Sequence, residues 1–147
     1  MASRDKKDLD TRVAQALEMA IARFKEKHPT LPQPFLTCAF RPDEEQNLDY
    51  AKGRTSPGKI VTNARAGQSP HNFKPSYAFD IAFTDSRGGL DWSHDLFEKF
   101  QQCVQEISSV MVWGYDWNGN GKKDKNDFDA PHWELKDWKK YINPNHV

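Results

Sequence analysis

The order of the predicted helices and strands is the feature of this sequence that most constrains its fold. Apolar residues recur at spacings of three and four over residues 8–27 and 94–107, which predicts two amphipathic helices. Short apolar segments typical of strands lie at 35–40, 77–83, 110–113 and 131–135. Helices and strands do not alternate regularly, so we expect an α+β fold with a small, mainly antiparallel sheet packed with helices.

Proline, glycine and capping residues predict the remaining boundaries. Pro42 opens a further helix that runs to about Tyr50, and Ser93 is expected to cap the helix at 94–107. Residues 53–70 are rich in glycine and proline, as in a long ordered loop or lid. A polar loop at 116–129 and a short helix near Asp137 follow. The sequence contains no repeat or linker, so we expect a single domain, residues 1–147.

Charge and hydropathy exclude several functions. The net charge of the 147 residues is zero, which argues against a nucleic-acid-binding protein and against attraction to anionic membranes. No apolar stretch is long enough to span a bilayer, and no apolar segment follows the charged first ten residues. We therefore expect synthesis and folding in a cytoplasm. Cys38 and Cys103 lack C-x-x-C spacing and are expected to be buried, reduced and inert.

Three residues form a candidate metal site. Asp80 interrupts the apolar strand at 77–83, and a carboxylate there is costly unless it is paired or bound to a metal. His71 lies at the rim of the Gly-rich loop and His132 at the edge of the last strand. Two imidazoles and one carboxylate suit a catalytic zinc ion, whose fourth ligand is water with a pKa near 7. From these residues alone, satisfied core or surface side chains remain the alternative.

Several sequence blocks together resemble a known family. The principal blocks are Ser69-Pro70-His71, Ala78-Phe79-Asp80 and Asp129-Ala130-Pro131-His132. Further similar blocks are Cys38-Ala39-Phe40-Arg41 with Glu44-Glu45-Gln46, then residues 58–64 and 67–69. Together they resemble the L-alanyl-D-glutamate endopeptidases of phage endolysins, within the zinc peptidase family of the D-Ala-D-Ala carboxypeptidases. One departure is the spacer Lys74-Pro75-Ser76-Tyr77, which lacks the family's glycine. We interpret it as a loop extension that leaves Asp80 in place.

The resemblance implies a fold, a site and a substrate. The fold would be that of the D-Ala-D-Ala peptidases and the hedgehog signalling domain, in which a similar metal set need not mean peptidase activity. His71, Asp80 and His132 would bind zinc, and Asp129 would be the general base and acid. Arg41 would act in catalysis and substrate binding together with Ser69, although Arg41 could equally be a surface residue at a helix start.

The resemblance also implies a biological role. The substrate would be bacterial peptidoglycan, cut during host cell lysis by a monomer without a cell-wall-binding domain. The protein would wait in the host cytoplasm and reach the wall through a permeabilised membrane. Two alternatives stay open: a D-Ala-D-Ala carboxypeptidase with the same zinc site, and a non-catalytic zinc- or calcium-binding interaction domain. Asp129 favours catalysis, since a structural site needs no acid beside an open metal position.

The polar loop before Asp129 has the spacing of an EF-hand calcium loop, with a glycine at position six. The candidate calcium ligands, with Lys122 contributing its backbone carbonyl, are Asp116, Asn118, Asn120, Lys122, Asp124 and Asp127. Bound calcium would fix the chain that delivers Asp129 and His132, and so switch activity. Position twelve is Asp rather than the usual Glu, and a solvated Asn-Gly turn is the alternative.

Overall fold

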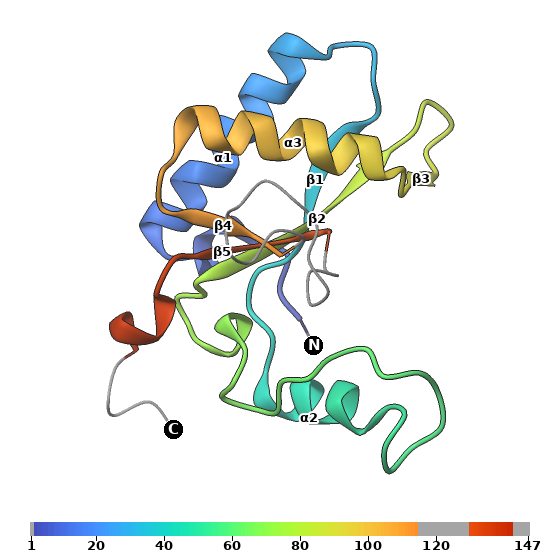
Figure 1. The fold of residues 1–147 in the computed structure, drawn as a ribbon, viewed down its shortest axis with the longest axis vertical. Coiled ribbons are helices and arrows are strands. Elements are labelled where there is room, and N and C mark those ends of the chain that lie inside the picture. Colours follow the sequence, from blue (N-terminus) through green and yellow to red (C-terminus); the bar gives the residue numbers. More distant parts are fainter. Residues whose placement is uncertain (1, 115–129, 143–147) are drawn as a thin grey trace.

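The computed structural model describes residues 2–114 and 130–142 and has an α+β architecture (Figure 1). A five-stranded sheet carries two long helices, α1 and α3, on one side, and every strand pair in it is antiparallel. The strands are β1 (Gln33–Cys38), β2 (Ala78–Thr84), β3 (Leu90–Asp91), β4 (Met111–Trp113) and β5 (His132–Leu135). The predicted fold class is therefore confirmed.

The strand order places the last strand inside the sheet. The order is β1-β2-β5-β4, and β3 pairs with the end of β2 beyond β5. Strand β3 was not predicted, because two residues are too few to show an alternating pattern. Strand β1 ends at Cys38 rather than at residue 40, because Ala39 N and Phe40 O hydrogen-bond to the backbone of Ser3 instead.

The helices occupy two regions of the molecule. Helices α1 (Thr11–Lys27) and α3 (His94–Ile107) pack together at one end, whereas α2 (Asp43–Ala51) lies at the opposite end (Figure 1). The predicted start of α1 at residue 8 is wrong. Asp10 caps the helix by accepting from Arg12 N, and Leu9 bridges to Ser76. Three short 3-10 turns complete the described chain: η1 (Lys6–Asp8), η2 (Pro70–Asn72) and η3 (Trp138–Tyr141).

Side-chain alternation in the two central strands separates the core from a polar face. Phe79, Ile81 and Phe83 of β2 are fully buried in the hydrophobic core, as are Trp133 and Leu135 of β5. Because successive side chains of a strand point to opposite faces, the intervening residues face away from that core. These residues include Asp80 on β2 and both His132 and Glu134 on β5.

Both cysteines are buried and free, as expected, and burial raises the pKa of the Cys103 thiol.

Ser93 precedes α3 as predicted, but its side chain does not cap the helix and its hydroxyl donates to Asp91 instead. None of the helices within the described ranges is long and apolar enough to cross a membrane.

Candidate metal centre

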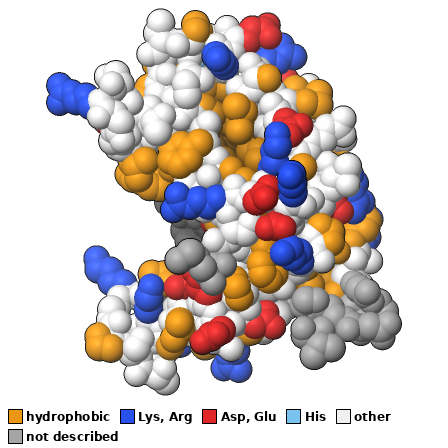
Figure 2. All heavy atoms as spheres, turned by 180° about the vertical axis from the view of Figure 1, so that it is seen from behind, with side chains coloured by type: hydrophobic (Ala, Val, Ile, Leu, Met, Phe, Trp, Pro, Cys, Tyr) orange, Lys and Arg blue, Asp and Glu red, His pale blue; other side chains and the backbone are white. Residues whose placement is uncertain are grey.

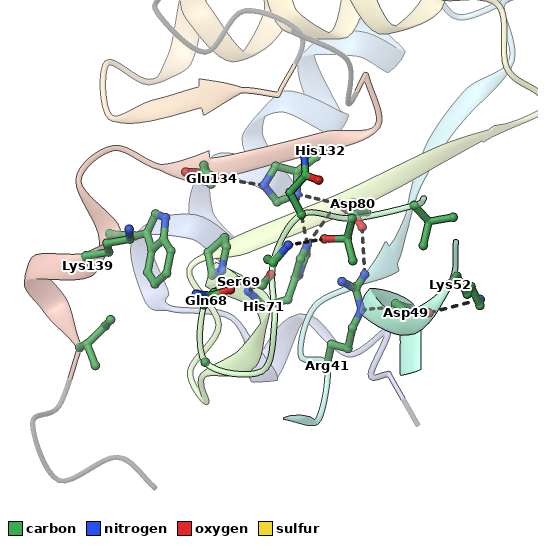
Figure 3. Close-up of a pocket in the computed structure, with 18 residues that line it drawn as sticks. Arg41, Asp49, Lys52, Gln68, Ser69, His71, Asp80, His132, Glu134 and Lys139 are labelled. Carbon is green, nitrogen blue, oxygen red and sulfur yellow. Dashed lines mark hydrogen bonds and ion pairs between the residues drawn. The ribbon is translucent and has the colours of Figure 1, made fainter. Parts of the chain in front are cut away.

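The three predicted ligands converge on one point of the polar face (Figure 3). His71 Nε2 lies 3.1 Å from Asp80 Oδ1 and 3.2 Å from His132 Nδ1. Asp80 Oδ1 lies 2.9 Å from His132 Nδ1. Two imidazole nitrogens and one carboxylate oxygen thus form a triangle, which is hereafter called the ligand triad.

Strand register brings two members of the triad together. Asp80 and His132 are directly opposite each other in the β2–β5 ladder. Cys38 is opposite Asp80 on the other side, in the β1–β2 ladder. Cys38, Asp80 and His132 therefore form a row across three neighbouring strands. Cross-strand neighbours on one face have their Cβ atoms about 4.5–5.5 Å apart, close enough to share a ligand.

A capped turn supplies the third member. His71 lies in η2, where Ser69 Oγ accepts from His71 N at 3.2 Å and Asn72 Oδ1 accepts from Ser69 N at 3.1 Å. Tyr77 N donates to Pro70 O at 3.1 Å, which ties the turn to the start of β2. His71 is therefore held beside Asp80 although nine residues separate them.

The spacer without glycine runs along the N-terminal segment. Ser76 N donates to Asp8 O at 2.7 Å, and Asp10 N donates to Ser76 O at 2.8 Å. Ser76 is fully buried. The additional residues are accommodated beside Asp8–Asp10 and do not displace Asp80 from His71, which supports the interpretation of this segment as a loop extension.

The charged groups of the triad shift one another's pKa values. Burial lowers the pKa of His71, but the adjacent Asp80 carboxylate raises it more, to about 9. Burial raises the pKa of Asp80, but His71 and His132 lower it more, so it lies well below its ordinary value. A metal ion entering this site would compete with a proton on His71.

The triad fits zinc in donor type and spacing. Zinc binds nitrogen and carboxylate oxygen at about 2.0–2.1 Å in a tetrahedral arrangement, which puts ligand atoms about 3.3 Å apart. The observed separations of 2.9–3.2 Å need only slight spreading. Among the described residues, the ligand atoms of Cys38, His71 and Asp80 also lie within 4.8 Å of one another, so this buried group could bind a metal such as zinc.

Cys38 lies near Nδ1 of the His71 ring, whereas Asp80 and His132 lie near Nε2. Its sulfur lies 3.7 Å from His71 Nδ1, and that nitrogen is 2.8 Å from the carbonyl oxygen of Ala39. A carbonyl oxygen only accepts hydrogen bonds, so His71 Nδ1 carries the proton and Nε2 faces His132. The structure therefore favours the triad with His132 as the primary ligand set, with Cys38 beside it.

Arg41 lies next to the triad. Its Nη2 is 3.7 Å from Asp80 Oδ2, and its Nη1 donates to Gln46 Oε1 at 3.0 Å. Gln46 is fully buried and donates to Ala64 O at 2.7 Å. Arg41 is thus a partly buried residue of the site rather than a surface residue at a helix start. Gln46 lies in a block that carries the family resemblance, but its contacts were not predicted, since they depend on how α2 meets the loop at 52–69.

A cleft of about 930 Å³ opens above the triad. One wall comes from α2 and the loop after it, including Lys52 and Asn63, and the other from Trp138 and Lys139 near η3. The space-filling view shows the molecule hollowed between the α2 region and the body that carries the sheet (Figure 2). Ser69, which was predicted to bind substrate, lines the cleft, and its hydroxyl caps the His71 turn.

Glu134 is a residue of the site that was not predicted from the sequence. This residue lines the cleft, and its Oε1 lies 2.9 Å from His132 Nε2 (Figure 3). The signal was available, because residues two apart in a strand share a face. The remaining predicted site residues lie outside the described ranges: Asp129 and the candidate calcium ligands Asp116, Asn118, Asn120, Lys122, Asp124 and Asp127.

The fold and the triad define an α+β domain with a candidate metal centre in a cleft, and the chain is similar to known proteins in sequence and in fold. No family model matches the chain. The peptidoglycan L-alanyl-D-glutamate endopeptidase CwlK of Bacillus subtilis (strain 168) is 33% identical over 104 residues, which are 68% of this chain and 59% of CwlK. The chain thus spans about three fifths of that relative.

A solved structure shares the fold. The crystal structure of the Serratia marcescens L-Ala D-Glu endopeptidase ChiX superposes with a TM-score of 0.62, over 96% of this chain and 92% of ChiX. The sequence identity in this comparison is 16%, so the likeness concerns the fold alone.

Proposed function

We propose that this chain is a zinc-dependent peptidase that cleaves the L-alanyl-D-glutamate bond in the stem peptides of peptidoglycan. The observation that carries the proposal is the ligand triad, in which His71, Asp80 and His132 meet within 3.2 Å at the floor of a cleft. The 33% identity to CwlK supports the choice of bond. An endopeptidase needs an open cleft because its substrate continues on both sides of the bond.

The residues of the site divide the proposed chemistry between them. Zinc, when bound by the triad, supplies Lewis-acid activation of water and of the scissile carbonyl. Arg41 lies beside Asp80 and offers a guanidinium group to a substrate carboxylate or a developing oxyanion. Asp129, three residues before His132, is the proposed general base and acid.

Digestion of purified cell walls tests the proposal. We expect the zinc-loaded protein to produce peptides with D-glutamate at a new amino terminus, which the masses of the products identify. A chelator should stop the reaction. His71→Ala should lose both bound zinc and activity. Asp129→Asn should keep zinc and lose about 10²–10⁴ in rate. Release of terminal D-alanine alone would show that the protein is instead a D-Ala-D-Ala carboxypeptidase. Zinc binding without cleavage of either bond would show that it is an interaction domain.

We further propose a role in host cell lysis for a phage. The similarity of residues 58–64 and 67–69 to the endolysin branch supports this role. The protein would accumulate as a monomer in the host cytoplasm and meet the wall once the membrane is permeabilised. Expression in a bacterium, with and without a membrane-permeabilising protein, tests this. We expect lysis only when this protein and the membrane-permeabilising protein are expressed together. Cells that stay intact with and without the permeabilising protein would contradict the proposal.

Calcium control is a separate proposal, supported by the EF-hand spacing of residues 116–127. Titration of the zinc-loaded protein with calcium, followed by Trp117 fluorescence and wall digestion, tests it. Binding with a rise in activity is expected. An unchanged activity at millimolar calcium would remove the switch and leave the zinc chemistry intact.

A further inference from the structure

The two imidazoles of the triad are held by different kinds of acceptor. The outer nitrogen of His71, Nδ1, lies 2.8 Å from the backbone carbonyl oxygen of Ala39. The outer nitrogen of His132, Nε2, lies 2.9 Å from the carboxylate oxygen Oε1 of Glu134. Both acceptors lie away from the point where the triad converges. Each ring therefore has one nitrogen committed to the protein and one directed to the centre.

These acceptors determine which nitrogen carries the proton. A neutral imidazole has one N–H and one lone pair, and a carbonyl or an ionised carboxylate can only accept. The N–H groups therefore belong to His71 Nδ1 and His132 Nε2. The lone pairs then lie on His71 Nε2 and His132 Nδ1, the two atoms that are 3.2 Å apart in the triad. In their neutral forms, both rings therefore direct a lone pair to the centre, as a metal ion requires.

Strand β5 fixes the geometry of the Glu134 contact. His132 and Glu134 are two residues apart, so their side chains share the polar face, while Trp133 between them is buried in the core. Ala78 is opposite Glu134 in the β2–β5 ladder, and its small side chain leaves space for the carboxylate. The side chain of His132 is only 7% exposed. The ring is thus confined between Asp80 and Glu134.

The carboxylate of Glu134 interacts with the imidazole ring of His132. Within residues 2–114 and 130–142, its ion-pair contact is with His132, whereas the Asp80 carboxylate also faces Arg41 at 3.7 Å. The imidazole ring stands between Glu134 and the convergence point of the triad. A carboxylate that accepts from the outer N–H raises the basicity of a histidine ligand and fixes its orientation.

We propose that Glu134 is the positioning residue of the metal centre, holding His132 in the tautomer that binds the ion and strengthening it as a ligand. This inference rests on the zinc centre of the proposed function but not on the bond that is cleaved. It predicts an asymmetric centre, in which one histidine has a neutral acceptor and the other a charged one.

Zinc affinity, measured by competition with a chromophoric chelator, tests the inference without reference to activity. For Glu134→Ala we expect the dissociation constant to rise about 10- to 100-fold, the usual effect of losing such a partner. Glu134→Gln keeps an acceptor oxygen for Nε2 but loses the charge, so a smaller rise is expected. The visible spectrum of the cobalt-substituted variants should shift, because it reports ligand strength and geometry directly.

The chain offers a matched control. Glu98 Oε1 lies 2.9 Å from His94 Nε2 on the exposed surface of α3, which is the same kind of contact at the same distance outside the cleft. Glu98→Ala should leave zinc affinity and the cobalt spectrum unchanged. Thermal unfolding of the metal-free variants separates folding defects from ligand effects, and Glu134→Gln remains informative if Glu134→Ala does not fold.

The outcomes distinguish the inference from the proposed function. Zinc affinity of Glu134→Ala within twofold of the parent protein would overturn the inference, even if the parent digests cell walls. A weakened affinity would support it, even if the parent cleaves another bond or none. A parent protein that binds no zinc would overturn both. In the supporting case, the activity lost by Glu134→Ala should be larger at limiting zinc than at saturating zinc.

Discussion

At the scale of single residues, the site depends on charges that are only partly exposed. Arg41 has 19% of its side chain exposed, Asp80 21% and His71 2%. Interactions between such groups are screened less by water and salt than surface ion pairs are. Small changes in these side chains should therefore have measurable effects.

Arg41→Lys should damage catalysis more than stability. A lysine keeps the charge but cannot reproduce the planar fork that reaches Gln46 and Asp80 together. We expect kcat/KM for wall fragments to fall by about 10-fold or more, the effect of about 1.4 kcal/mol or more in transition-state stabilisation. The free energy of unfolding of the zinc-loaded protein should change by less. If the free energy of unfolding fell by as much as the transition-state stabilisation derived from kcat/KM, the role of Arg41 would instead be structural.

The metal-free protein should lose stability as the pH rises above 6.5. The pKa of His71 is about 9 in the folded chain and 6.5 in the unfolded chain, so its contribution is complete below pH 6.5 and is lost as the pH passes through 9. Asp80 has a lowered pKa, so its contribution is present above pH 3.8 and is lost as the pH falls. Chelator-treated protein should be most stable between about pH 4 and 6.5.

Urea unfolding of the chelator-treated protein at several pH values measures this effect, which could reach about 3 kcal/mol for His71. His71→Gln provides the control, because glutamine does not titrate and the decline between pH 6.5 and 9 should flatten. An unchanged midpoint for the parent protein across this range would show that the His71–Asp80 pair does not form without metal.

At the scale of secondary-structure elements, Gln46 joins α2 to the loop at 52–69. Its side chain accepts from Arg41 and donates to Ala64 O, and it is fully buried. Gln46→Ala would leave both partners without this bond, at a cost of about 1–3 kcal/mol in unfolding free energy. Asn47→Ala is the matched control, because Asn47 accepts from Ala66 N in the same loop but is exposed.

Thermal unfolding and wall digestion of the two variants measure the difference. We expect Gln46→Ala to lose stability and also to raise KM, since the loop forms one wall of the cleft. Asn47→Ala should stay within about 0.5 kcal/mol of the parent. Similar losses in both variants would mean that the loop is held by exposed contacts rather than through Gln46.

Sequence periodicity was sufficient to predict the long helices and the four longer strands, because each buries one face in the core. It failed where structure depends on a distant segment. Strand β3 exists through its pairing with β2, and α1 starts late because Leu9 bridges to Ser76. The triad was predictable from ligand types and the family resemblance. The contacts of Cys38 and Gln46 were not, although both residues lie in blocks that carry the resemblance, since strand register and the approach of a loop bring them to the site.

At the scale of the whole molecule, zinc should stabilise the fold. Its proposed ligands come from η2, β2 and β5, so only the folded chain presents them together. At free zinc a hundredfold above the dissociation constant, we expect about 2.7 kcal/mol of added stability. For a domain of this size that corresponds to about 5–10 °C in Tm. Calorimetry with zinc and with chelator measures the shift.

His132→Ala is the control for this measurement, because it removes a ligand whose neighbours in the core are unchanged. Its Tm should be nearly the same with zinc and with chelator. A full zinc-dependent shift in this variant would place the ion elsewhere, for example at the group formed by Cys38, His71 and Asp80.

The interior position of β5 has a consequence for how the protein is made. His132 lies 52 residues after Asp80 and 61 after His71, yet β5 pairs directly with β2 inside the sheet. During translation, the earlier strands leave the ribosome with a gap in the sheet that only β5 can fill. A nascent chain that has not reached residue 132 lacks two of the three pairwise contacts of the triad. The order of synthesis therefore delays the ligand triad: its three side chains come together only after β5 has completed the sheet.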